Sequence, residues 1–178
     1  MTAANRRLMW HGMFLFLLGL ATGMLEKHFT NMRMGLSAHL EGVMNGTFLV
    51  VLGAIWTEVK LSLPAKTAAF WTALYGTYAN WFFTTLGATF GTAAANPILA
   101  AGHHGQPWQE TLAGVGFRSV EVAITAASLL VFWGLRARAI SKQRYFVTSR
   151  SPKAVVLCCG WSATALRTNG THARRVVG

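Results

Sequence analysis

The stretch GLSAHLEGVMNGTFLVVLGAIW, residues 35–56, decides the fold class of this chain. Its second half is almost wholly apolar, as expected of a helix that faces lipid or a protein core. Its first half places His39, Glu41 and Asn45 among small residues, where polar groups are costly unless they have partners. Because ~20 residues cross a bilayer, the stretch predicts a membrane-spanning helix that carries a polar site.

The composition of the whole chain agrees with a membrane protein. Of its 178 residues, 53% are hydrophobic and 12% are charged, against roughly 25% charged in an ordinary soluble domain. The net charge of +11 would also suit a nucleic-acid binder, but nine of the sixteen basic residues follow residue 135. This distribution is typical of a membrane protein with a cytoplasmic tail, so we expect no nucleic-acid partner.

Four apolar runs are long enough to span a membrane. They cover residues 8–25, 36–56, 67–91 and 112–135, with boundaries approximate. Lys and Arg gather before the first run, between the second and third, and after the fourth. An excess of Lys and Arg marks the cytoplasmic side. We therefore expect an all-α, integral membrane four-helix bundle with both termini in the cytoplasm.

The sequence predicts two parts, a membrane domain over 1–136 and a basic cytoplasmic tail over 137–178 that is poorly ordered. The tail contains no acidic residue, and its apolar patch AVVLCCGW is too short to span a membrane. Its basic residues suit contact with anionic membrane lipid. The adjacent Cys158 and Cys159 lack the spacing of a zinc site, and we expect them to be reduced.

Polar side chains from three predicted spans fall at one depth. With a helical rise of ~1.5 Å per residue, Asn45, Asn80 and Glu121 lie roughly 14–16 Å from the outer ends of their spans. Such a set predicts a functional site, although interhelical hydrogen bonds, with Arg118 and Glu121 paired at i, i+3, would explain the same residues. Tyr78, in the third span, is either a phenolic donor or a core residue.

His39 is the candidate metal ligand. Ala38, Gly42 and Gly46 leave bare backbone beside it, which is typical of a close helix contact in membranes. Alternatively, the bare backbone at Gly42 leaves room for a flat macrocycle whose iron takes the His39 imidazole as axial ligand. Asn45 lies about 120° away around the helix. If the helix sits between two cofactors in an oligomer, His39 would bind one iron and Asn45 would face the open side of the next.

Four segments resemble the hydroxylaminobenzene mutase family, small membrane enzymes of bacterial nitroarene breakdown. They are HGMFLFLLGLATG (11–23), NMRMGLSAHLEGVMNGTFLVVLGAIW (31–56), LYGTYANW (74–81) and GHHGQPWQETL (102–112). The resemblance covers residues 6–136. It implies an isomerase in the bacterial cytoplasmic (inner) membrane that rearranges aryl hydroxylamines to ortho-aminophenols.

A more distant resemblance is to the styrene oxide isomerase family, four-span, trimeric membrane proteins that hold ferric haem b. The shared features are HG in the first span and, in the second, a histidine followed six residues later by Asn-Gly. The resemblance implies that His39 is the haem ligand, that Asn45 lies near the open iron face, and that the chain forms a homotrimer. That family also uses an aspartate and a tyrosine in its third span. This chain has no aspartate.

Together these features predict a membrane isomerase in which ferric haem b is a Lewis acid and an apolar pocket excludes water from a small aromatic substrate. Asn45 would orient the substrate N–OH group, and Asn80, Tyr78 or Glu121 would assist the proton shift. Arg118 would bind a haem propionate or pair with Glu121. The alternatives are a haem-dependent epoxide isomerase, a haem electron-carrier subunit with two axial histidines, and a cofactor-free scaffold or channel.

Overall fold

The computed structural model describes residues 2–93 and 95–148, with side chains up to residue 136. Its helices are α1 (Ala3–Met24), η1 (Glu26–His28), α2 (Met32–Ile55), α3 (Leu63–Phe90), α4 (Pro97–Ala100) and α5 (Pro107–Thr148). These described residues include no strand, which confirms the predicted all-α class. The chain divides into two compact units, Met1–Ser141 and Lys142–Gly178, and all contacts reported below belong to the first.

The second unit is described only where α5 ends. Residues 149–178, which make up most of the predicted tail with Cys158 and Cys159, lie outside the described residues. The helix α5 continues past the predicted end of the fourth span, residue 135, to Thr148. Because most of the tail lies outside the described residues, its lack of order stays a prediction.

Local signals set where the helices begin and end. Asn31 precedes α2, and its side chain accepts a hydrogen bond from the Met34 amide at 3.1 Å, so α2 begins before the predicted span. Such caps satisfy backbone N–H groups that have no partner within the helix. Proline in the first turn of α3 suits a helix start, and α3 ends at Gly91, whose positive φ of 68° favours glycine.

Three helices are long and apolar enough to cross a membrane by length and composition: α1, α2 and the segment of α5 from Pro107 to Arg136. The remaining long helix, α3, has 28 residues and so a length of roughly 42 Å, which exceeds a hydrocarbon core of about 30 Å. It is less apolar because it contains six threonines, two tyrosines and Asn80.

The threonines of α3 satisfy their hydroxyl groups within the helix. Five of them donate to the carbonyl four residues earlier at 2.7–2.9 Å; they are Thr72, Thr77, Thr84, Thr85 and Thr89. Inside a bilayer no water is present to take these hydrogen bonds, so each polar group needs an internal partner. The threonine content of α3 therefore does not by itself prevent it from crossing a membrane.

The helices α1 and α2 pack with their backbones in contact. A Cβ atom at Gly12 would lie 2.7 Å from the Gly46 carbonyl oxygen, and one at Gly19 would lie 2.6 Å from the Val43 nitrogen. Only glycine fits such a contact, and small residues that let backbones approach are a common basis of helix association in membranes. The small residues of the second predicted span therefore form a helix contact, which was one of the two interpretations of that pattern.

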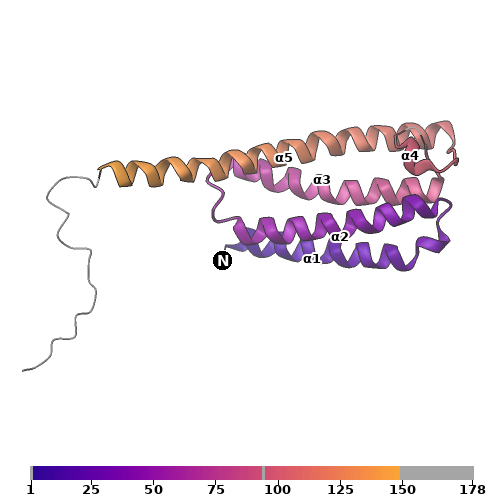
Figure 1. Cartoon of the computed structure of the whole chain (residues 1–178), viewed down its shortest axis with the longest axis horizontal. Coiled ribbons are helices and arrows are strands. Elements are labelled where there is room, and N and C mark those ends of the chain that lie inside the picture. Colours follow the sequence, from indigo (N-terminus) through magenta and orange to yellow (C-terminus); the bar gives the residue numbers. More distant parts are fainter. Residues whose placement is uncertain (1, 94, 149–178) are drawn as a thin grey trace, which may run out of the picture. The chain divides into compact units, whose positions relative to one another are not determined.

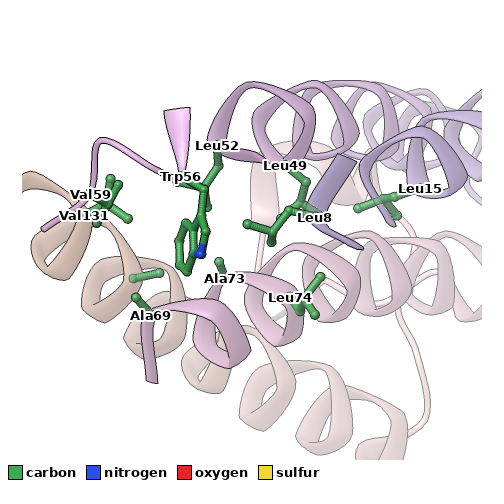
Figure 2. Packing of buried hydrophobic residues seen from close by; sticks show 11 residues of the cluster. Leu8, Leu15, Leu49, Leu52, Trp56, Val59, Ala69, Ala73, Leu74 and Val131 are labelled. Atoms are coloured by element: carbon green, nitrogen blue, oxygen red, sulfur yellow. The ribbon is translucent and has the colours of Figure 1, made fainter. Parts of the chain in front are cut away.

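One hydrophobic cluster joins the four long helices of the first unit near the end that carries the N-terminus (Figures 1 and 2). Its core includes Leu8 of α1, Leu49 of α2, Ala73 of α3 and Val131 of α5. Trp56, which follows α2, lies among these side chains. At the opposite end, α4 belongs to the connection between α3 and α5 (Figure 1).

Many large apolar side chains lie on the outside of the described residues. Met44 of α2 is 67% exposed and Val122 of α5 is 71% exposed. Further examples are Leu17, Leu36, Leu40, Phe48, Val51, Phe82, Val115, Leu129 and Phe132. In water these exposed side chains would forgo the stabilisation that burial gives, whereas a hydrocarbon environment accommodates them without that cost. The surface thus agrees with the three membrane-length helices.

Candidate functional site

His39 is held in one tautomer by the backbone of α1. Its Nδ1 atom lies 2.8 Å from the carbonyl oxygen of Gly19. Because a carbonyl oxygen can only accept, Nδ1 carries the hydrogen and donates, and Nε2 keeps its lone pair. The ring also packs against Gly23, where a Cβ atom would lie 2.6 Å from Nδ1. A histidine that binds a metal usually donates its other ring N–H to a carbonyl or carboxylate in this way.

The donors around His39 would suit a haem better than a bare metal ion. No group of three or more His, Cys, Asp or Glu side chains that could hold a metal ion occurs among the residues whose side chains are described. A haem brings four nitrogen donors of its own and needs one or two from the protein. The single lone pair at Nε2 of His39 meets that need.

Glu41, Asn45 and Asn80 form a polar cluster between α2 and α3. The Asn45 Nδ2 atom donates to Glu41 Oε2 at 3.2 Å, and Asn80 Nδ2 donates to the same oxygen. Asn45 and Asn80, for which helical rise predicts a similar depth, are brought together through Glu41. Glu41 was recognised as a costly polar residue but was not among the predicted site residues. Its i, i+4 spacing to Asn45 was the signal that could have identified it.

Glu41 and Asn80 of this cluster border a cavity of ≈ 240 Å³ formed by α2, α3, α5 and the connection around α4, whereas Asn45 does not line it. Its polar lining comes from Ser37, Glu41, Asn80, Thr84, Asn96 and Glu121. Met34, Phe117 and other apolar side chains complete the wall. Six of the eleven residues that line the cavity are polar, so it offers mainly hydrogen-bonding groups to a small molecule.

The connection that covers this cavity is held by two side chains. Asn31 donates through Nδ2 to the carbonyls of Leu99 and Ala100 at 2.8 and 3.0 Å. Glu110 accepts from the amides of Ala93 and Gly105 at 2.8–3.0 Å. The roles of Asn31 and Glu110 are not predictable from the sequence, because their partners are backbone groups of an irregular segment that no spacing rule connects to them.

Glu121 and Arg118 are paired on the exposed side of α5. Arg118 Nη1 lies 3.1 Å from Glu121 Oε2, and the two side chains are 82% and 62% exposed. The i, i+3 ion pair, one of the two roles predicted for Arg118, is therefore present. Glu121 also borders the polar cavity and, with Arg118, a neighbouring hollow of ≈ 490 Å³.

Two of the predicted site residues, Gly42 and Tyr78, contact α1 instead of the polar cluster. The Tyr78 hydroxyl donates to the His11 carbonyl at 3.1 Å and lies 3.2 Å from His11 Nδ1, so it links α3 to α1. Gly42 is buried, and a Cβ atom there would collide with the Gly19 backbone and with Trp81. Protein atoms of the same chain therefore fill the space beside Gly42, so a macrocycle held by His39 would not lie against Gly42. We leave Gly42 and Tyr78 out of the site proposed below.

Comparisons with known proteins agree on one group of relatives. The family model described as styrene oxide isomerase matches residues 4–136. Hydroxylaminobenzene mutase HabB of Ectopseudomonas oleovorans is 46% identical over 133 residues, covering 74% of this chain and 81% of that protein. Hydroxylaminobenzene mutase HabA of the same organism is 38% identical over 125 residues, covering 70% and 93%. No solved structure matches the chain.

Proposed function

Because the chain belongs to the styrene oxide isomerase family and is an isomerase, we propose that it rearranges aryl hydroxylamines to ortho-aminophenols. The observation that carries this substrate is the 46% identity to a protein named hydroxylaminobenzene mutase over 81% of that protein's length. In the reaction the hydroxyl group moves from nitrogen to the ortho carbon and one hydrogen moves from that carbon to nitrogen. No electrons or water are consumed.

His39 would hold ferric haem b through Nε2, since Nδ1 is engaged by Gly19. When bound, the haem would supply a Lewis acid for the N–O group. Two features of His39 support this proposal. The hydrogen bond to Gly19 fixes the tautomer of the ring, and the ring offers one ligand atom, Nε2.

Asn45 and Asn80 would orient the substrate. Each amide directs its Nδ2 group to Glu41, which leaves both carbonyl oxygens to accept from the substrate N–H or O–H. Phe117 and Met34 in the cavity wall would exclude water. Exclusion of water matters because it would otherwise add to the activated ring in place of the returning hydroxyl group.

We also propose that the chain crosses the bacterial inner membrane four times, with both termini in the cytoplasm. The positions of Lys and Arg support this orientation. The satisfied threonine hydroxyls of α3 support a fourth crossing in addition to the three apolar helices.

The functional protein is proposed to be a homotrimer, with the number three taken from the resemblance to styrene oxide isomerase. Two features of the single chain support self-association. The Arg118–Glu121 pair lies in the apolar part of α5 and is largely exposed, and charged groups facing lipid are costly. In addition, His39 contacts α1 whereas Asn45 points to Glu41 and α3, so one chain does not direct both residues to the same place.

The test is an assay of detergent-purified protein with phenylhydroxylamine and with styrene oxide. We expect 2-aminophenol from the first substrate as the main activity, together with a Soret absorbance band. Conversion of styrene oxide alone would instead favour the epoxide isomerase that the family model suggests. Failure to convert either compound in a pigmented preparation would contradict the proposal.

A further inference from the structure

We propose that Glu41 carries the proton from the ortho carbon of the substrate to its nitrogen, an inference that rests on the proposed function. When the new C–O bond forms and the N–O bond breaks, the ortho carbon still holds its hydrogen. That hydrogen must leave as a proton to restore the aromatic ring, and the nitrogen must gain one proton. One carboxylate that accepts the first proton and donates it again balances the reaction without any further reactant.

The cavity offers few groups that can perform this transfer. Of the described residues that border it, only Glu41 and Glu121 place a carboxyl group at the cavity. Asn80 and Asn96 are primary amides, which neither accept nor release protons near neutral pH. The third-span phenol, Tyr78, is engaged with His11 and does not border the cavity. The choice therefore lies between the two carboxylates.

Their surroundings separate the two carboxylates. Glu121 is 62% exposed and its Oε2 is paired with Arg118, so it would serve the reaction only by giving up that ion pair. Glu41 is half-buried, and its Oε2 accepts from Asn45 and Asn80. Among the described residues no donor contacts its Oε1. One oxygen thus anchors the carboxylate to two helices, while the other remains available for a proton.

The position of Glu41 also suits the two sites of the transfer. The amides that anchor it are the same groups proposed to orient the N–OH end of the substrate. Asn80 borders the cavity together with Glu41. A substrate in the cavity that is held by the Asn80 carbonyl oxygen would therefore have its nitrogen and ortho carbon near the carboxylate. General acid–base catalysis requires such proximity before any question of acidity arises.

The experiment compares Glu41→Gln with wild type and with Glu26→Gln, which makes the same change at a carboxylate outside the cavity. Turnover of phenylhydroxylamine should fall by ~100-fold or more in Glu41→Gln, the usual size of a lost acid–base group, and remain near wild type in Glu26→Gln. The Soret band should be retained in both. Substrate deuterated at both ortho carbons should react more slowly than normal substrate, by a larger ratio in Glu41→Gln than in wild type.

A second variant, Glu41→Ala, decides between proton transfer and a structural role. Added formate should restore part of its turnover, because a small carboxylic acid can occupy the space of the missing side chain and carry the proton. Near-normal turnover in Glu41→Gln would overturn the proposal. A slow Glu41→Ala enzyme whose turnover formate does not restore would also overturn the proposal. This test holds even if Glu41→Gln fails to fold. Inactive wild-type protein would instead contradict the proposed function itself.

Discussion

His39 illustrates how a single hydrogen bond prepares a side chain for a function. The Gly19 carbonyl holds the hydrogen on Nδ1 and thereby leaves the lone pair on Nε2. The ring fits beside α1 only because residue 23 is glycine. The chemistry proposed for this histidine therefore depends on two residues of another helix as well as on its own.

Replacement of His39 by alanine should abolish haem binding. The Soret band of the purified protein should disappear, because the proposed axial ligand is lost, whereas His28→Ala in the exposed turn of η1 should leave it unchanged. Absorbance spectra of both variants, scaled to protein concentration, measure this. An unchanged spectrum in His39→Ala would remove His39 from the role of ligand.

The pair of helices α1 and α2 depends on glycine where the two backbones touch. A side chain at Gly12 would meet backbone atoms of Gly46 and Val50, which cannot move aside without separating the helices. In contrast, a Cβ atom at Gly114 in α5 would meet nothing within 4 Å. The two positions therefore provide a matched comparison of the same substitution.

We expect Gly12→Ala to lower the free energy of unfolding by about 1–3 kcal/mol, the usual cost of overpacking. Gly114→Ala should be neutral or stabilising by up to about 1 kcal/mol, since alanine favours helix over glycine. Thermal unfolding of both variants in one detergent measures the difference. Equal stability of the two would show that the close contact between α1 and α2 is not needed.

For the chain as a whole, the number of crossings decides on which side each terminus lies. Four crossings place both termini on one side, whereas crossing by α1, α2 and α5 alone would place them on opposite sides. The location of the C-terminal segment relative to the N-terminus therefore tests whether α3 spans the membrane.

The native Cys158 and Cys159 are convenient reporters of this location. A membrane-impermeant maleimide should label them only after cells are opened, and the same should hold for Ala3→Cys in a chain without the native cysteines. His104→Cys, in the connection before α5, should be labelled in intact cells. Labelling of the native cysteines in intact cells, with Ala3→Cys protected, would contradict a fourth crossing.

The polar residues show how far sequence reasoning could reach. Helical rise predicts that Asn45, Asn80 and Glu121 share a depth in the membrane, and in the structure Asn80 and Glu121 border one cavity. Rise does not predict which side of its helix a residue occupies once the helices have packed. Glu121 consequently pairs with Arg118 on the exposed side, and Asn45 turns to Glu41.

The sequence by itself determined the helical class and the membrane-length apolar segments, because the thickness of a bilayer dictates how many apolar residues a span needs. It also singled out His39. Only the tertiary structure decided that Gly42 is covered by α1, that Gly19 orients the imidazole, and that Glu41 joins Asn45 to Asn80. These contacts depend on how each helix is rotated and how closely it approaches its neighbours, and spacing along one chain contains neither quantity.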